Sequence, residues 1–433
     1  MAAFRRMVPG LSANTSASRE VLRREISLVA SLLRQCSCVV LWFFVFSVAC
    51  SVEVINGIGT VGKLCGLIAF ALGFCAVLST GHYRRLTLVH VFMAWFVFQE
   101  AITCFWSMDP FATVETSITF VQLLGSAWLV WELTDSQQRL KNLLNALVIG
   151  TIVPSLYTIA NYSTNRQFAW ERYSGAGFDV NDLGVLLAIS IVWSIHLMSR
   201  AAKWTALLYW AQIGVVSFTI LLTASRTATI AALVALAYIP FSSGQVIARK
   251  AVAYAVVAVA LVGVLWISAP ASSRIRLLSI VPEVVNGDLS GRTPVWKSGL
   301  KQFESHTFVG VGAGAFGKSV QESMKDEFVA HNTFLSVLVE GGIGCLCAFG
   351  SLCVLLLRWV LRMPSEQRNL WLFTVAVWMV GASTLTLEHH KITWLVFSLI
   401  TAQAGILRKY KDCEHHSRVS DLVHHPAFVG ARG

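Results

Sequence analysis

Charged residues are scarce in this sequence. Asp, Glu, Lys and Arg make up 13% of the 433 residues, whereas hydrophobic residues make up 55% and the mean hydropathy is +0.64. Soluble domains carry roughly a quarter charged residues, so this composition excludes an ordinary soluble globular protein. The apolar residues form continuous runs of about 20, which is the length that an α-helix needs to cross a bilayer. The sequence therefore predicts an all-α, polytopic membrane protein.

Motifs for metal, disulfide and nucleotide chemistry are also missing. The chain has ten cysteines, but none forms a CxxC pair and most lie inside apolar runs. The segments between these runs contain no HExxH and no DxD, and the glycine-rich segment 308–316 is not followed by the GK[ST] of a phosphate-binding loop. We therefore expect no metal, no cofactor, no nucleotide and no nucleic acid. An activated donor would have to come from the membrane.

Hydropathy predicts about twelve membrane spans. With them we expect a cytoplasmic N-terminal segment 1–32, nine spans within 33–269, a long periplasmic loop 270–332 that carries short helices, three spans within 333–407 and a cytoplasmic tail 408–433. The predicted spans are 33–52, 58–79, 87–106, 113–133, 142–161, 180–198, 204–223, 227–243, 250–269, 333–359, 369–387 and 391–407.

The distribution of lysine and arginine predicts the orientation. Most basic residues fall in the termini and in every second turn, which the positive-inside rule places in the cytoplasm together with both termini. The formal net charge of +11 follows from this bias and does not require nucleic acid as a partner. Most of the basic residues on the other side lie within 270–332, where topology disfavours them. These residues therefore need another explanation.

Side chains that suit an anionic substrate are predicted to meet at the outer face. Arg172 lies in an outer loop, Arg226 in a turn between two spans, and Arg292 at the start of the motif GRTPVW. His331 directly precedes the span that begins near Thr333. A guanidinium group presents a planar fork of donors that matches phosphate oxygens two at a time and stays charged. Together these residues predict a diphosphate site that needs no metal.

Each arginine also has a purely structural interpretation. Arg226 could anchor its turn by reaching to lipid headgroups, as long basic side chains do at membrane interfaces. Arg292 could begin a helix on a solvated loop, and Arg172 could serve the structure of its own loop. The sequence leaves these alternatives open.

His331 is the predicted general base, because a neutral imidazole accepts a proton near working pH. Asn332 is a suitable N-cap for the helix that follows, and the nearby helix N-terminus and arginines should lower the pKa of His331. The alternative is a histidine that only caps or hydrogen-bonds at the interface. Glu340, which would be costly in lipid without a partner, is expected to support an arginine or histidine or to pack helices. Gly341 and Gly342 suggest a kink beside it.

Four motifs resemble, in their order along the chain, those of the O-antigen ligase and O-antigen polymerase superfamily. They are SRT at 225–227, GRTPVW from Gly291, FVGVGAGAF at 308–316 and HNTFLSVLVEGGIG from His331. The segment ERYSGAGFDVNDLG resembles the upstream outer loop of that family, with Asn181 at its usual asparagine. The resemblance covers about 170–345, and the flanking spans match in number and topology only. The doubled glycine at Gly342 departs from the family pattern.

The resemblance implies a metal-independent glycosyltransferase in the inner membrane of a Gram-negative bacterium, with a periplasmic active site. Such enzymes take a glycan from undecaprenyl diphosphate, and a ligase transfers it to a sugar hydroxyl of lipid A–core. On this chain Arg226 and Arg292 would hold the diphosphate, and His331 would activate the acceptor hydroxyl. The residues expected to bind or position substrate are Arg172, Asn181, Asn332 and Glu340. One displacement at the anomeric carbon would invert its configuration.

Other functions fit part of the pattern. A polymerase of the same superfamily would transfer the glycan to another lipid-linked repeat, and a protein-glycosylating ligase would transfer it to a protein. A transporter of lipid-linked glycan is the alternative from a different class, and it would need ionisable groups near mid-membrane and usually internal repeats. Glu100 is the clearest deep acid, and no repeat is evident. We favour the ligase because one outer loop dominates the sequence.

Overall fold

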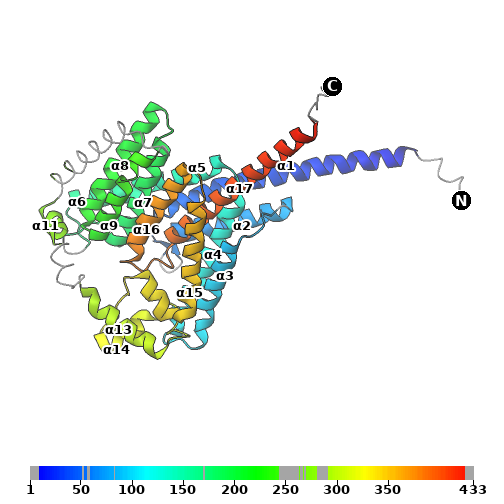
Figure 1. Ribbon diagram of the computed structural model, residues 1–433. Coiled ribbons are helices and arrows are strands. Elements are labelled where there is room, and N and C mark those ends of the chain that lie inside the picture. The colour runs from blue at the N-terminus through cyan, green and yellow to red at the C-terminus, as the bar shows by residue number, and fades with distance from the viewer. Residues whose placement is uncertain are drawn as a thin grey trace, which may run out of the picture.

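The computed structural model describes residues 9–50, 53–55, 59–81, 83–168, 171–242, 263, 267, 270–279 and 291–424 (Figure 1). These residues form helices almost throughout, so the predicted all-helical class is confirmed at this level. The exception within them is a ribbon of two short antiparallel strands, β1 (Glu53–Ile55) and β2 (Gly59–Thr60).

Several helices begin where a polar side chain accepts a hydrogen bond from a free backbone N–H, as at Asp109, Ser136 and Asp179. The helices of the first part are α1 (Pro9–Ser47), α2 (Val61–Thr80), α3 (Leu88–Ile102), η2 (Thr103–Phe105), α4 (Pro110–Leu133), α5 (Gln137–Gly150), α6 (Ile152–Ser163), α7 (Val180–Met198), α8 (Lys203–Thr223), α9 (Arg226–Leu236) and η3 (Ile239–Phe241). Those of the second part are α11 (Ala271–Leu278), α13 (Arg292–Ser305), α14 (Phe316–Met324), α15 (Thr333–Leu361), α16 (Ser365–Ala382) and α17 (Lys391–His424).

Within the described residues, seven helices are long and apolar enough to cross a membrane, which supports a multi-pass membrane protein. They are Leu28–Ser47, Val61–Ser79, Leu88–Phe105, Gln137–Ser163, Val180–Met198, Lys203–Thr223 and Thr333–Leu361. A shorter apolar helical segment covers Arg226–Phe241.

The structure does not establish the predicted number of about twelve spans. Helices α4, α16 and α17 occupy three predicted spans, but they are not among the seven apolar helices. Their polar residues lower the hydropathy, and many of these are buried inside the protein; Ser398 and Thr401 of α17, for example, donate to backbone carbonyls one turn earlier. The predicted span 250–269 falls almost wholly outside the described residues.

Two predicted spans have different ends in the structure. The first, 33–52, is part of α1, which begins at Pro9 and ends at Ser47. The fifth, 142–161, is interrupted at Thr151, where α5 gives way to α6. At the other end of the chain, α17 continues to His424, so much of the predicted tail 408–433 is helical.

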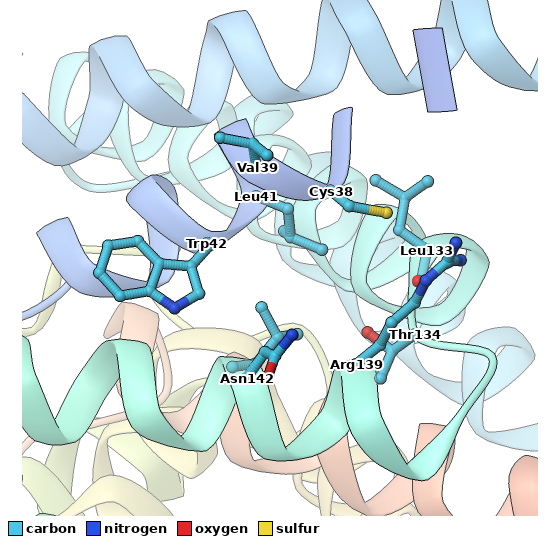
Figure 2. Close-up of a pocket in the computed structure, with 9 residues that line it drawn as sticks. Cys38, Val39, Leu41, Trp42, Leu133, Thr134, Arg139 and Asn142 are labelled. Atoms are coloured by element: carbon cyan, nitrogen blue, oxygen red, sulfur yellow. The ribbon is translucent and has the colours of Figure 1, made fainter. Parts of the chain in front are cut away.

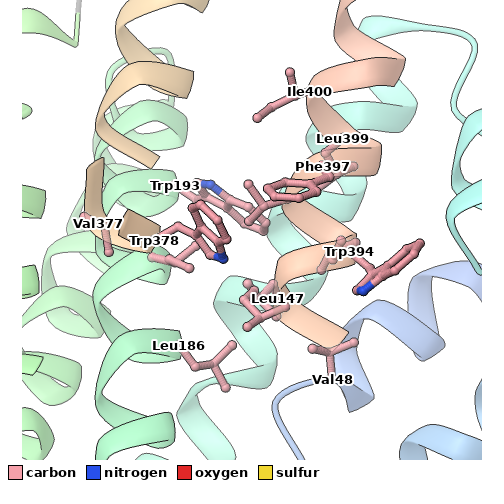
Figure 3. Packing of buried hydrophobic residues seen from close by; sticks show 14 of the residues in the cluster. Val48, Leu147, Leu186, Trp193, Val377, Trp378, Trp394, Phe397, Leu399 and Ile400 are labelled. Carbon is pink, nitrogen blue, oxygen red and sulfur yellow. The ribbon is translucent and has the colours of Figure 1, made fainter. Parts of the chain in front are cut away.

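Helix α7 lies at the centre of the packed helices and contacts α5, α8, α9 and α16. The apolar core beside it contains Trp193, Trp378 and Phe397, which Figure 3 shows between the helices. The two indoles are large amphipathic groups, and their N–H groups find partners: Trp193 donates to the hydroxyl of Thr374 (3.2 Å) and Trp378 to that of Thr393 (2.9 Å). These bonds fix α16 against α7 and α17.

Helices α13 and α14 lie at one end of the bundle, below the start of α15 in Figure 1. The glycine-rich loop 308–316 joins them and contacts the turn between α3 and α4. There the backbone N–H of Ala313 donates to the hydroxyl of Thr103 (3.0 Å), and the indole of Trp106 donates to the carbonyl of Val309 (3.0 Å). This end of the bundle also holds the starts of α7, α9 and α15.

Candidate functional site

Arg226 is placed by a tight turn between α8 and α9. Ala224 adopts a left-handed conformation (φ 48°), which reverses the chain after α8. Ser225 then caps α9: its hydroxyl accepts from the N–H of Ala228 (3.3 Å) and donates to the side-chain oxygen of Asn181 (2.8 Å). Arg226 is therefore the first residue of α9, at the level where α7 begins, and its side chain is half-buried.

Arg172 is held against the same turn. Its Nε donates to the carbonyl of Thr223 (2.9 Å), and its Nη2 donates to the side-chain oxygen of Asn181 (2.8 Å). Burial, followed by the positive charges of Arg276, Arg226 and Arg292, lowers the pKa of Arg172 to about 10 against the opposing carboxylate of Asp179. The group stays protonated at neutral pH, and its surroundings are strongly cationic.

Arg292 opens α13 directly after Gly291. Burial lowers its pKa, and so does the charge of Arg226, while Asp179 opposes both. The indole of Trp296, one turn along α13, donates to the carbonyl of Ala330 (2.8 Å). This bond ties the helix that carries Arg292 to the residue immediately before His331.

His331 has a left-handed backbone (φ 47°) and precedes the cap of α15. The side-chain oxygen of Asn332 accepts from the N–H groups of Phe334 and Leu335 (both 3.1 Å), so Asn332 is an N-cap, as predicted. Burial lowers the pKa of His331 below its ordinary value of 6.5, the charge of Arg292 lowers it further, and Asp179 opposes this. The direction is the one expected from the sequence, and it keeps the ring neutral near pH 7.

Helix α15 is broken inside its apolar run, where the sequence suggests a kink. Gly342 has φ 74° and ψ −173°, a conformation that is essentially restricted to glycine. The break leaves the carbonyls of Val339 and Glu340 free to accept from the N–H groups of Val311 (3.0 Å) and Gly312 (2.9 Å). The glycine-rich loop therefore replaces the missing helical hydrogen bonds.

Glu340 also binds the glycine-rich loop through its side chain. One carboxylate oxygen accepts from the N–H of Gly314 (2.8 Å) and the other from the N–H of Phe316 (3.3 Å). A Cβ at Gly310 would lie 2.1 Å from the carbonyl of Glu340, so only glycine permits this close approach. The carboxylate thus binds backbone groups, and its charge also raises the pKa of His389, although no hydrogen bond or ion pair joins the two side chains in the described part of the chain.

Alanine in place of Gly342 is expected to destabilise the protein by about 1–3 kcal/mol or more, because it forces a strained conformation. The added Cβ would also lie 2.5 Å from the carbonyl of Phe308. Gly350 is a matched control on α15, since a Cβ there meets nothing within 4 Å and its backbone is helical. Thermal unfolding in detergent measures both variants. Equal melting temperatures for Gly342→Ala and Gly350→Ala would show that the break is not needed.

Sequence reasoning missed Asp179 and Arg276. Asp179 caps α7 and accepts from the N–H of Asn181 (2.8 Å), and its exposed carboxylate acts on Arg172, Arg292 and His331. An Asp directly before an apolar run is a cap signal that could have found it. Arg276, which lies on α11, lowers the pKa of Arg172 more than any other charge. No local pattern marks it as part of the site.

The sequence also did not predict a role for the loop 383–390, which lies against the start of α15. The hydroxyl of Thr333 donates to the carbonyl of Leu385 and accepts from the N–H of Leu387 (both 2.8 Å). Burial alone would lower the pKa of His389, but the carboxylate of Glu388, 3.5 Å from its Nδ1, raises it overall. Asp182, His389, His390 and Lys391 line part of a cavity of about 190 Å³ beside the start of α7.

The described helices define a multi-pass helical membrane protein. At one end of the bundle it carries the guanidinium groups of Arg172, Arg226 and Arg292 and the neutral imidazole of His331. Residues 211–349 match the model of the O-antigen ligase family, and this segment includes Arg226, Arg292 and His331. Residues 211–349 are therefore similar to the O-antigen ligase family, which confirms the resemblance seen in the motifs. Arg172 and Asn181 lie outside the matched segment.

A curated protein is also similar to this chain. The exopolysaccharide production protein ExoQ of Rhizobium meliloti (strain 1021) is 22% identical to this chain over 347 residues, which is 75% of this chain and 78% of the relative. The similarity extends beyond the matched segment, and it supports membership of the same superfamily.

Proposed function

We propose that the protein is an O-antigen ligase: a metal-independent, inverting glycosyltransferase that moves a glycan from undecaprenyl diphosphate to a sugar hydroxyl of lipid A–core. The observation that carries this proposal is that four separate segments bring their charges together: Arg226 and Arg292 act on Arg172, Arg226 acts on Arg292, and Arg292 acts on His331. The family match supports the class of reaction. We place the protein in a Gram-negative inner membrane with this end of the bundle in the periplasm.

The arginines would bind the diphosphate of the donor. Undecaprenyl diphosphate leaves with additional negative charge once the bond between its oxygen and the anomeric carbon breaks, and fixed guanidinium groups stabilise that charge. Each charge-assisted hydrogen bond contributes about 1.5–3 kcal/mol. Arg226 and Arg292 begin α9 and α13, so both side chains start from helix N-termini, which favour anions.

His331 would act as the general base. The acceptor hydroxyl gives its proton to a ring nitrogen of His331, and its oxygen forms a bond to the anomeric carbon on the face opposite the diphosphate. The bond to the diphosphate breaks in the same displacement, so the configuration inverts and the diphosphate leaves as an anion. A lowered pKa suits this role, because the ring is free to accept a proton at neutral pH.

The remaining predicted residues would position these groups. The side-chain oxygen of Asn181 already accepts from both Arg172 and Ser225, so we assign it to holding Arg172 in place. Asn332 orients the start of α15 beside His331, and Glu340 holds the glycine-rich loop. Arg172 would assist the diphosphate site from the loop before α7.

The ExoQ relative favours a second candidate within the same superfamily. A protein named for exopolysaccharide production suggests that this chain polymerises a lipid-linked glycan, with a second lipid-linked repeat as the acceptor. Donor, diphosphate site and base would be the same. Only the acceptor differs, so the product distinguishes the two functions.

Reconstitution tests the proposal. The purified chain in liposomes receives undecaprenyl-diphosphate glycan together with lipid A–core, and the products are separated by gel electrophoresis. A ligase gives glycan on lipid A–core, and a polymerase gives a ladder of lipid-linked repeats without it. Movement of donor across the bilayer without either product would identify a transporter. A chelator is expected to leave the rate unchanged, and loss of activity would contradict the metal-independent mechanism.

The rate should depend on pH through His331. Its pKa lies below 6.5, so the rate is expected to rise from the acid side and level off by about neutral pH. Arg292→Gln removes a charge that lowers this pKa, which should move the acid limb to higher pH. Asp179→Asn keeps the helix cap but removes the charge that raises this pKa, which should move the limb to lower pH. Initial rates between about pH 5 and 8 measure both shifts. Limbs that move in the same direction would rule out His331 as the titrating group.

A further inference from the structure

The opposite end of the bundle holds a second cluster of basic side chains, around a cavity of about 820 Å³. Its walls come from α1, the turn between α2 and α3, the last residues of α4 and α15, and α17. The basic residues that line it are Arg34, Arg84, Arg85, Arg408 and Lys409. Two acidic residues also line it, Glu132 and Asp135, so the cationic groups are in excess.

Both carboxylates are already engaged with neighbouring groups. Asp135 pairs with Arg34 (2.9 Å) and with Arg139 (3.0 Å). A carboxylate oxygen of Glu132 accepts from the backbone N–H of Arg84 (2.7 Å). Among the described side chains, no carboxylate pairs with the remaining basic residues of the cavity, Arg85, Arg408 and Lys409.

Two guanidinium groups are held in place on aromatic rings. Arg84 lies with its central carbon 3.7 Å from the ring centre of Trp131, and Arg408 lies 4.5 Å from that of Trp359. Arg84 also donates to the carbonyls of Trp131 and Thr134. The side chain of Arg84 is half-buried, and this burial lowers its pKa. The positive-inside rule also places basic residues at the cytoplasmic ends of membrane helices. That rule does not require their side chains to be held on aromatic rings or to line a cavity.

An apolar cavity of about 300 Å³ is lined by Leu133 and Thr134, whose chain neighbours Glu132 and Asp135 line the cationic cavity (Figure 2). Val39, Leu41 and Trp42 of α1 line it, together with Leu133. Its Arg139 pairs with Asp135, which also lines the cationic cavity. A cationic cavity therefore lies beside an apolar one at the same end of the membrane helices.

We propose that the cationic cavity binds the phosphate head group of an anionic phospholipid, with an acyl chain along the neighbouring apolar surface. Basic pockets between membrane helices are known to suit such head groups. Leu86 and Leu88, which line the cavity, are 60% and 63% exposed and would contact the lipid chains. A free inorganic phosphate would make the cationic contacts but would leave these apolar surfaces uncovered. The site is independent of the proposed glycosyl transfer, which takes place at the other end of the helices.

Native mass spectrometry of the full, delipidated chain in detergent tests this site. Phosphatidylglycerol is added to one sample, phosphatidylcholine to a second and inorganic phosphate to a third. We expect phosphatidylglycerol to bind most tightly. The double variant Arg85→Gln with Lys409→Gln should weaken its binding roughly ten- to thirtyfold, since two basic contacts near the headgroup are lost. The single change Lys409→Glu should weaken it as well.

Arg358→Gln with Arg362→Gln is the matched control. These two arginines are exposed near the end of α15, at the same end of the bundle, and neither lines the cavity. The control removes the same charge, so binding should stay within about twofold of the unmodified chain. If both double variants lost phosphatidylglycerol binding equally, the binding would depend only on surface charge, and the proposed site would be wrong. Equal binding of the two lipids would overturn it, and so would tight binding of phosphate without a preference for phosphatidylglycerol.

Discussion

Replacing His331 by alanine is expected to lower the rate of glycan transfer about 10²–10⁴-fold, because a positioned general base contributes that much. The loss should fall mainly on kcat, since the imidazole acts on the acceptor hydroxyl during bond formation and not on the bound donor. The backbone at position 331 is left-handed (φ 47°), so alanine also brings some strain there. Asparagine tolerates that conformation and cannot act as the base, which makes His331→Asn the cleaner variant.

His306 provides the control for this change. It directly follows the last residue of α13 at the same end of the bundle, and its Nδ1 lies 3.2 Å from the carbonyl of Gln302. His306→Ala should therefore leave kcat within a few-fold of the unmodified enzyme. Turnover is measured in the reconstituted system at saturating donor. If both His331 variants keep full turnover while folding normally, the base lies elsewhere and the proposed mechanism fails.

Local sequence rules predict the elements that position the site. The run 180–198 coincides with α7 because Asp179 caps it and the residues after it are apolar. Asn332 marks the start of α15 by the same rule, and Gly342 marks its break. Capping and glycine conformations depend on a few neighbouring residues, so a sequence contains the necessary information.

The partners of those residues depend on tertiary structure and were not predictable. Glu340 was expected to support an arginine or histidine or to pack helices. Its carboxylate accepts from the backbone N–H groups of Gly314 and Phe316, and its charge raises the pKa of His389. Those donors are available because Gly310, Gly312 and Gly314 adopt positive φ and let the loop approach α15 closely. Arg276 reaches the surroundings of Arg172 through the packing of α11 on α8, which no periodicity reveals.

The polar residues of the membrane helices explain the uncertainty in the number of spans. Hydropathy treats each polar side chain as if it faced lipid, whereas Thr374 and Thr393 face other helices and accept from buried indoles. The mean hydropathy of such a helix can be too low for it to be recognised as a membrane span, although the helix packs within the bundle. Whether a polar side chain is buried inside the protein depends on the fold. The number of membrane spans therefore cannot be obtained correctly from composition alone.

The second large effect is expected at the arginines. Arg292→Gln should lower kcat/KM about 10- to 10²-fold, since the proposed charge-assisted contact to the diphosphate, which would contribute about 1.5–3 kcal/mol, is lost in the transition state. Arg292→Lys keeps the charge but not the planar fork, so it should recover part of the loss. Arg226→Gln should act similarly. The double variant should lose less than the product of the single losses, because each arginine affects the other's charge environment.

Arg166→Gln is the matched control, because Arg166 is an exposed arginine in the loop after α6. Its kcat/KM should stay within about twofold of the unmodified enzyme. Binding of a soluble diphosphate such as pyrophosphate, measured as inhibition, separates the explanations further. Loss of inhibition in Arg292→Gln and Arg226→Gln, with retention in Arg166→Gln, is the expected result, because only the first two are proposed to bind the diphosphate. Normal inhibition in all three variants would mean that the guanidinium groups serve the fold, and the donor would then have to bind at another site.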